Sequence, residues 1–142
     1  MTTIVWDGEH IYTDSQCTTG DYKALVQKSW RVVTPDGPVS AAICGEFDRE
    51  VAVRAALADG KPVEGLLGEE AELLVVGRTE ARVYGGGKSY VVSPPVFLGS
   101  GAGPARGAYQ IVRSAMPAVK AAIAVDLYSG GPIRKLKAKL GR

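Results

Sequence analysis

The second residue of the chain is a threonine directly after an initiator methionine, and this pair can generate a nucleophile. A methionine before a small residue is normally removed, which would leave Thr2 with a free α-amine. This amine has a reference pKa of about 7.7–8.0, so part of it is neutral near pH 7. One residue would then supply both a hydroxyl nucleophile and its general base. By itself, however, a Thr-Thr start is more often the ordinary beginning of a strand.

The composition argues against several other kinds of chemistry. One histidine and two cysteines, without metal-ligand spacing, leave little material for a zinc site or a histidine-dependent triad. We therefore expect no metal and no cofactor. A net charge of +2 is too small to indicate nucleic acid or a membrane surface as a partner. Five basic residues near the end of the chain favour a solvated strand face or tail over a polyanion site: Arg134, Lys135, Lys137, Lys139 and Arg142.

Chain length and terminal residues give expectations about domain organisation and location. The 142 residues, 46% of them apolar, suffice for one core, so we expect a single domain over residues 1–142. The beginning lacks the pattern of a signal peptide, and no stretch approaches the roughly 20 apolar residues of a membrane span. We expect a cytoplasmic protein in which Cys17 and Cys44 stay reduced.

Hydrophobic periodicity predicts the elements that must position Thr2. Alternating or continuous apolar runs predict strands at residues 2–7, 10–14, 28–34, 39–44, 71–76, 81–84, 90–98 and 133–140. Helical spacing predicts helices over residues 47–58, 104–115 and 118–127, with Pro117 separating the last two. Because strands and helices do not alternate one by one, this order indicates an α+β fold with mainly antiparallel sheets.

Five short motifs accompany these elements. They are Asp14-Ser15-Gln16-Cys17-Thr18-Thr19-Gly20, then Lys28, Cys44-Gly45, Leu98-Gly99-Ser100-Gly101 and Asp126-Leu127-Tyr128-Ser129-Gly130-Gly131. Each motif alone has an ordinary explanation, such as a strand end, a surface lysine or a glycine that ends a helix. Together, in this order and from residue 2 to residue 131, they resemble the proteasome β-subunit/HslV-type N-terminal nucleophile (Ntn) threonine peptidases.

The resemblance implies a catalytic role for the residues of these motifs. Thr2 would attack a peptide carbonyl, with its own α-amine as the base. Lys28, kept charged by the carboxylate of Asp14, would stabilise the developing alkoxide and lower the pKa of the amine. The backbone N–H of Gly45 would donate to the oxyanion. Three further residues would orient the amine and the attacking water: Ser100, Ser129 and Asp126.

The resemblance also implies how a substrate binds. Thr18 and Gly45 would pair through their backbones with an extended peptide. Glu46, Ala42 and Trp30 would line the specificity pocket. An acidic side chain at that place would favour a basic residue before the cleaved bond.

The implied fold is a sandwich of two antiparallel sheets with flanking helices, in four layers α/β/β/α. One helical layer should be reduced, because only residues 61–70 separate the first helix from the next strand. The family has a second long helix there, and Gly60, Pro62, Gly65 and Gly68 work against one in this chain. Since these helices help the family's rings pack against each other, ring size and a double ring stay open.

The implied function is that of a threonine peptidase that works as a homo-oligomeric ring on peptides or unfolded proteins. The pattern Gly-x-x-x-x-Gly-Lys-Ser/Thr is absent from the sequence, so energy for unfolding would come from a separate AAA+ ATPase. Two alternatives stay open: an Ntn amidohydrolase that acts on a small amide, and a catalytically inactive member with a structural or binding role. A retained Met1 would favour the inactive alternative, whereas the full set of motif residues argues against it.

Overall fold

A computed structural model describes residues 2–45 and 47–141 of the chain. Within these ranges the strands form two antiparallel sheets and a separate hairpin. The four-stranded sheet has the order β10 (Val96–Leu98), β1 (Ile4–Trp6), β2 (His10–Thr13) and β11 (Arg134–Lys137). The five-stranded sheet has the order β5 (Ser29–Thr34), β6 (Gly37–Cys44), β7 (Glu72–Val76), β8 (Ala81–Gly85) and β9 (Lys88–Val92). The hairpin consists of β3 (Gln16–Thr19) and β4 (Tyr22–Leu25).

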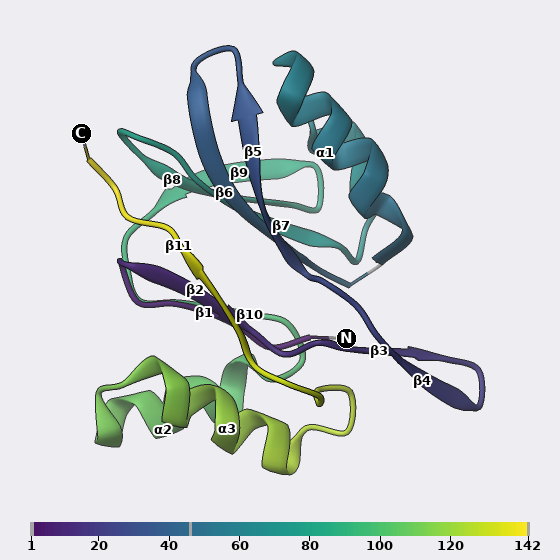
Figure 1. The fold of residues 1–142 in the computed structure, drawn as a ribbon, viewed down its shortest axis with the longest axis vertical. Helices are drawn as coiled ribbons and strands as arrows, with labels where there is room; N and C mark the ends of the chain where they lie inside the picture. Colours follow the sequence, from purple (N-terminus) through teal and green to yellow (C-terminus); the bar gives the residue numbers. More distant parts are fainter. Residues whose placement is uncertain (1, 46, 142) are drawn as a thin grey trace.

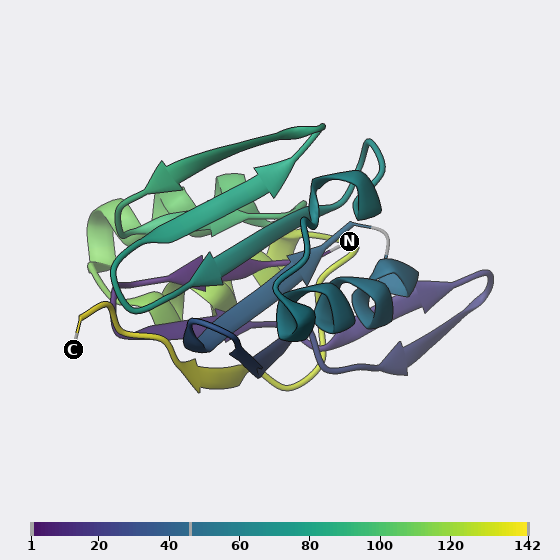
Figure 2. The same ribbon diagram turned by 90° about the horizontal axis from the view of Figure 1, so that it is seen from above.

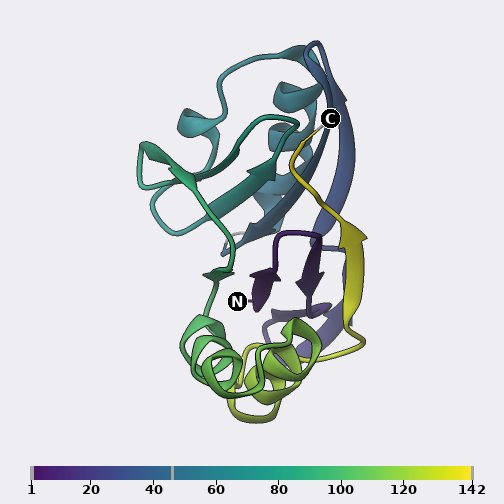
Figure 3. The same cartoon turned by 90° about the vertical axis from the view of Figure 1, so that its left-hand side faces the viewer.

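The two sheets lie face to face, and helices cover their outer faces (Figure 1). One helix, α1 (Glu50–Asp59), packs on the five-stranded sheet. Two helices, α2 (Ala102–Val112) and α3 (Ala115–Val125), pack on the four-stranded sheet. The helix pair, the two sheets and α1 follow one another as successive layers in Figure 3. The predicted α+β fold, with antiparallel sheets in an α/β/β/α sandwich, is confirmed.

Side-chain alternation along the strands builds three cores between these layers. In β1, Ile4 and Trp6 face the other sheet, whereas Val5 between them contacts the helix pair. In β6, Ala42 faces the other sheet and Ile43 packs toward α1. Residues 4–6 and 41–44 of these strands are covered on both faces, so they are continuously apolar rather than alternating with polar residues.

The helical layer over the five-stranded sheet is thin, as predicted. Apart from α1, this layer contains only the short 3₁₀ segments η1 (Phe47–Arg49) and η2 (Glu64–Leu66) within the described residues. The helix α1 ends at Gly60, whose φ of 69° is a left-handed conformation that glycine adopts without strain. Figure 2 shows α1 crossing this face and the β3–β4 hairpin projecting to one side.

The single strand predicted at residues 90–98 is wrong. Residues up to Val92 belong to β9 in the five-stranded sheet, and residues from Val96 belong to β10 in the four-stranded sheet. Pro94 and Pro95 lie between them, and a proline has no N–H to donate to a ladder. The chain crosses from one sheet to the other at this point.

The helix break predicted at Pro117 is also misplaced. Pro117 lies in the first turn of α3, where a backbone N–H would have no partner within the helix in any case. The break comes earlier, at Arg113 with φ of 55° and at the extended Ser114. A left-handed residue followed by an extended one ends α2 and redirects the chain.

The hairpin of β3 and β4 was not predicted, because residues 14–20 were interpreted only as a motif. The turn contains Gly20, which has φ of 56°. The side chains of β4 are exposed, so the hydrophobic pattern of this strand gives little signal. The hairpin leaves the sandwich beside the beginning of β1 and carries the predicted substrate-binding Thr18.

Candidate active site

Hydrogen bonds hold the backbone of Thr2 and Thr3 from both sides, just before β1. The N–H of Thr2 donates to the Oγ of Ser100 at 3.2 Å, and the N–H of Gly101 donates to the Thr2 carbonyl at 3.2 Å. On the other side, the N–H of Thr3 donates to Asp14 Oδ1 at 3.0 Å, and Asp14 N–H donates back to the Thr3 carbonyl at 3.2 Å. The first residues therefore lie between the loop after β10 and the end of β2, which flank β1 in the sheet.

The Gly-Ser-Gly loop can approach this backbone only because two of its residues lack a Cβ atom. Gly99 has φ of 91°, and a Cβ atom there would overlap the carbonyl oxygen of Thr2. A Cβ atom on Gly101 would overlap the Oγ1 of Thr3. The two glycines thus let the loop place Ser100 against the amide of Thr2.

Asp126 connects this loop to the segment after α3. Its Oδ2 accepts hydrogen bonds from the hydroxyls of Ser100 at 2.6 Å and of Ser129 at 2.5 Å. Burial raises the pKa of Asp126, but the two hydroxyls and the backbone N–H of Tyr128 outweigh burial, so the pKa lies below its usual value. Ser129 Oγ also lies 2.7 Å from Thr3 Oγ1. The ionised carboxylate thereby holds both serines against the first residues of the chain.

Asp14 and Lys28 form a buried ion pair on the opposite side of Thr3. The Nζ of Lys28 lies 2.9 Å and 3.1 Å from the two carboxylate oxygens, with relative exposures of 1% for Lys28 and 0% for Asp14. The N–H of Gly130 donates to the same carboxylate at 3.0 Å. Burial lowers the pKa of Lys28 below its ordinary value, and the carboxylate of Asp14 opposes this shift.

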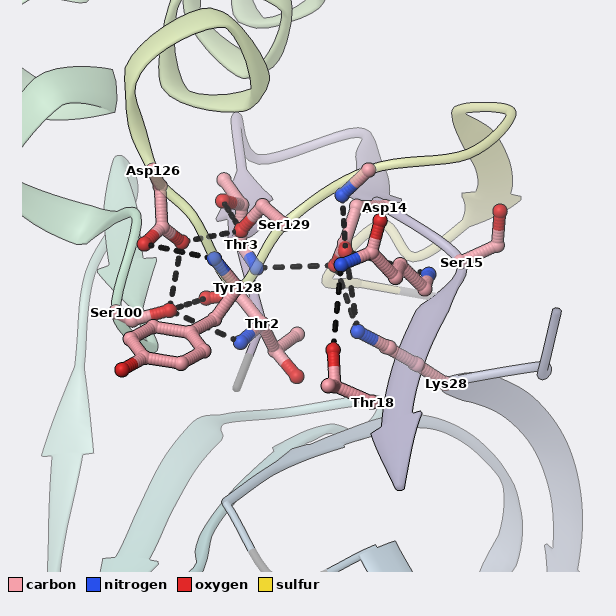
Figure 4. A network of polar contacts seen from close by, with 12 residues as sticks. Thr2, Thr3, Asp14, Ser15, Thr18, Lys28, Ser100, Asp126, Tyr128 and Ser129 are labelled. Carbon is pink, nitrogen blue, oxygen red and sulfur yellow. Dashed lines mark hydrogen bonds and ion pairs between the residues drawn. The ribbon is translucent and has the colours of Figure 1, made fainter. Parts of the chain in front are cut away.

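The two halves of the network meet at the beginning of the chain (Figure 4). Lys28 Nζ and Thr3 N–H donate to the same oxygen of Asp14, so the ammonium lies within two hydrogen-bond lengths of the Thr3 amide. Figure 4 shows the side chain of Thr2 directed to the side on which Lys28 and Thr18 lie. The arrangement brings together a hydroxyl, a buried cation and a pair of serines held by a carboxylate, which suits nucleophilic attack on a carbonyl.

Gly45 lies at the end of β6 and takes no part in this network. It has φ of 90°, and a Cβ atom there would lie 2.5 Å from the carbonyl oxygen of Glu70, so the position requires glycine. The preceding Cys44 lies close enough to Lys28 for the ammonium to act on its pKa. Burial dominates there and raises the pKa of Cys44 to about 12, which keeps it a neutral thiol.

The structure separates two residues that were predicted to line the specificity pocket together, Trp30 and Ala42. Trp30 is buried under α1 with the guanidinium of Arg54 5.1 Å from its ring centroid, whereas Ala42 is buried between the two sheets. The two side chains lie on opposite faces of the five-stranded sheet, so the predicted pocket that contains both is wrong. Thr18 is exposed on β3 and accepts a hydrogen bond from Gln16 Nε2 at 3.3 Å. Glu46 lies outside the described residues.

Sequence reasoning missed two residues of the network. Thr3 is fully buried and links the Asp14 side to the Ser129 side, yet a second threonine in a strand carries no specific signal. Gly130 donates to Asp14, and a Cβ atom there would overlap the side-chain oxygen of Gln16. The only available signal for Gly130 was its place inside the Asp-x-x-Ser-Gly-Gly motif.

Residues 2–45 and 47–141 contain no group of three or more histidine, cysteine or acidic residues that could hold a metal ion. None of the helices formed by those residues is long and apolar enough to cross a membrane.

Comparisons with known proteins identify the fold. No family model and no curated protein matches the chain. Among solved structures, BPH of Thiobacillus denitrificans in complex with epoxomicin is similar, with 19% identity, 99% of each chain covered and a TM-score of 0.74. HslV of Trypanosoma brucei is similar with 20% identity, 99% of each chain covered and a TM-score of 0.69.

A third similar structure is the helical assembly of the Anbu complex from Pseudomonas aeruginosa. Its identity to this chain is 13%, the TM-score is 0.71, and the match covers 98% of this chain and 83% of that one. These identities are too low to transfer an activity, but the matches extend over almost the full length. The chain therefore has the proteasome-like N-terminal nucleophile hydrolase fold shared by HslV, BPH and Anbu.

Proposed function

We propose that the chain is a threonine peptidase in which Thr2, freed by removal of Met1, attacks the carbonyl carbon of a peptide bond. The single observation that carries this proposal is the hydrogen-bond network around residues 2 and 3. It joins the backbone nitrogen of Thr2 to Ser100 and Asp126, and it joins the next amide to the buried pair of Asp14 and Lys28. A network of this kind, built around a chain terminus, suits an N-terminal nucleophile.

The first half of the reaction would form an ester on the threonine. The α-amine of Thr2 accepts the hydroxyl proton while Oγ bonds to the carbonyl carbon. The ammonium of Lys28 stabilises the developing negative charge, and the N–H of Gly45 donates to the oxyanion. The amine then returns its proton to the leaving nitrogen as the peptide bond breaks.

The second half would release the product by hydrolysis. A water molecule attacks the ester carbon, and the α-amine, held by Ser100, accepts its proton. The ester oxygen of Thr2 takes the proton back as the acid product leaves. Asp126 keeps both serines fixed through this cycle, because its lowered pKa leaves it ionised at neutral pH.

Assembly and substrate supply extend the proposal. We propose that the protein forms a homo-oligomeric ring in the cytoplasm and acts on peptides or on proteins unfolded by a separate AAA+ ATPase. The helical assembly of Pseudomonas aeruginosa Anbu supports oligomerisation in general, since that protein shares the fold. Size-exclusion chromatography with light scattering measures the oligomeric state, and a monomer at micromolar concentration would contradict the proposed ring.

The experiment that tests the activity combines intact mass, labelling and substitution. Intact mass should show loss of Met1. Epoxomicin, which is bound in the similar BPH structure, should add covalently to the residue-2 peptide of this chain in a mass map. Thr2→Ala should abolish both labelling and cleavage of fluorogenic peptides, whereas Thr79→Ala, an exposed threonine in the β7–β8 turn, should change neither. A processed chain that neither reacts nor cleaves peptides would contradict the peptidase proposal.

The same experiment separates the two alternatives. Covalent labelling at Thr2 without cleavage of any peptide would favour an amidohydrolase that acts on a small amide. A chain that retains Met1 and resists labelling would favour an inactive member with a structural or binding role. Wild type is compared throughout with the Thr2→Ala variant, so that background reactivity of other hydroxyls is subtracted.

A further inference from the structure

A cavity with no residue of the Thr2 network in its lining lies at the other end of the sandwich. Its volume is about 770 Å³, within the range of roughly 300–1,000 Å³ that is usual for small-molecule sites. Three segments form its walls: the turn between β5 and β6, the turn after β7, and the segment that follows β11. Figure 3 shows this last segment running alongside the β5 and β6 strands toward the C-terminus.

The charge of the lining is strongly asymmetric. Four basic side chains line the cavity, and Asp36 is the single acidic residue in the lining. The basic residues are Arg31, Arg78, Lys137 and Lys139. Among the residues that the structure describes, none of the four is joined to a carboxylate by an ion pair. Four cations gathered around one concave space repel one another, and a bound anion would relieve that repulsion.

Hydrogen bonds fix the C-terminal wall of the cavity. Trp6 Nε1 donates to the carbonyl of Ala138 at 2.6 Å, and Ala138 N–H donates to the carbonyl of Glu9 at 2.7 Å. The N–H of Gly141 donates to the carbonyl of Arg78 at 2.6 Å. Ala138 is buried at 2% exposure, while its neighbours on either side are the two lysines that line the cavity. The backbone that carries the two exposed lysines is therefore held in place by hydrogen bonds on both sides.

The opposite wall is held to the same segment. Ser40 Oγ donates to the carbonyl of Lys137 at 2.8 Å, and an Arg31 guanidinium N–H donates to that carbonyl at 3.4 Å. The cavity thus joins the five-stranded sheet to the strand at the edge of the four-stranded sheet. Its floor includes the buried side chains of Ser40 and Val76. A ligand bound there would contact both sheets at once.

We infer that this cavity is a binding site for a small phosphate-bearing polyanion. The volume of the cavity is large enough for a nucleotide or a short polyphosphate. Two guanidinium groups suit phosphate oxygens because each can donate two parallel hydrogen bonds, and two ammonium groups add point charges. A net lining charge of this sign would not favour a cation or a neutral molecule. Lys137 and Lys139 are exposed, as expected for a solvated strand face or tail, and the inference adds a bound anion as their partner.

Binding should also stabilise the fold, because a ligand that binds only the native state shifts the unfolding equilibrium. Isothermal titration calorimetry and thermal unfolding with sodium tripolyphosphate, ATP without magnesium, and citrate measure this directly. We expect tripolyphosphate and ATP to bind and to raise the Tm, and citrate to bind more weakly. ATP binding tighter than tripolyphosphate would identify a nucleotide, and equal binding would identify the phosphate chain alone; both outcomes support the site.

Charge reversal inside the cavity provides the decisive comparison. The double variant Arg78→Glu/Lys139→Glu should weaken binding by about a hundredfold, because each substitution removes one charge-assisted contact. The matched control is Lys88→Glu/Lys120→Glu, which changes the net charge equally at two exposed lysines outside the lining. The control should bind like the wild type. Equal weakening in both variants, citrate binding tighter than both phosphate compounds, or no binding of phosphate ligands to the wild type would overturn the inference.

Discussion

Replacing Asp14 with asparagine removes the carboxylate that pairs with the buried ammonium of Lys28. This carboxylate accepts the two contacts from Lys28 at 2.9 and 3.1 Å, the Thr3 N–H at 3.0 Å and the Gly130 N–H at 3.0 Å. An asparagine has the same shape, but its NH₂ group is a donor that faces other donors. The variant therefore loses a charge and gains an unsatisfied buried group.

The magnitude follows from the burial of both partners. Removal of one partner from a buried ion pair typically costs about 3–5 kcal/mol, because the remaining charge is left without compensation. For a chain of this length, 1 kcal/mol corresponds to a shift in Tm of roughly 3–4 °C, so Asp14→Asn should lower the Tm by about 10–20 °C. The same change lets the pKa of Lys28 fall further, since the carboxylate is what opposes the effect of burial.

A double variant tests whether the loss of stability comes from the ammonium of Lys28 that is left without a counter-charge. In Asp14→Asn/Lys28→Met the uncompensated charge is gone, so the free energy of unfolding should recover most of what the single variant loses. We expect no peptidase activity in either the single or the double variant. The control for a surface pair is Glu50→Gln, which breaks the exposed contact with Arg54 and should cost no more than about 0.5 kcal/mol.

Urea unfolding of all four proteins at pH 7 measures these differences. The reasoning would be refuted if Asp14→Asn lowered the free energy of unfolding by less than about 1 kcal/mol, or if the double variant were no more stable than the single one. Either result would mean that the buried charge of Lys28 does not depend on Asp14 for its compensation.

Three other predictions concern the loop, the pH dependence and the buried thiol. Gly99→Ala should lower the free energy of unfolding by about 3 kcal/mol or more, because the positive φ of Gly99 and the nearby Thr2 carbonyl leave no room for a methyl group. The control Gly103→Ala should not lower the free energy of unfolding, because a methyl group there meets open space. Burial lowers the pKa of Lys28 below its ordinary value of 10.5, so peptidase activity should fall as the pH rises through that lowered pKa. Over the same range, up to pH 10.5, the contribution of Lys28 to the free energy of unfolding should increase, because the unfolded chain binds the proton more tightly. A loss of activity that begins only at or above pH 10.5 would contradict this prediction. Cys44, whose pKa is raised to about 12, should resist alkylation by iodoacetamide at pH 8 until the protein is unfolded, whereas the half-buried Cys17 should react. Peptide mapping of the alkylated protein measures the reaction at each cysteine.

Most strands and turns could be predicted from the sequence, because their signals are local. The strands predicted at residues 2–7 and 10–14 are β1 and β2, and Gly8, with φ of 102°, lies in the turn that joins them. Gly86 and Gly87, with φ of 58° and 74°, form the turn that joins β8 to β9. In both places the glycines occupy conformations that other residues avoid, so the turn residues predict the turn.

The errors arose where a local signal has two meanings. Pro117 was expected to break a helix, but a proline is equally compatible with the first turn of one. Strand 90–98 was predicted as continuous, because periodicity does not say in which sheet each half of an apolar run will pair. Trp30 was assigned to a pocket without knowledge of which face of its strand points to α1.

The order of residue types along the chain establishes which groups are available for chemistry. It predicted a candidate nucleophile at Thr2, and the resemblance to the threonine peptidases implied roles for Ser100 and Asp126. The proximity of these groups, in contrast, is a property of the folded chain, since Thr2 N–H and Ser100 Oγ are 98 positions apart in sequence yet 3.2 Å from each other. That contact depends on the pairing of Ile4 with Leu98 in the sheet and on glycines that permit close approach. Sheet register and packing are cooperative properties of the whole chain, and no local pattern specifies them.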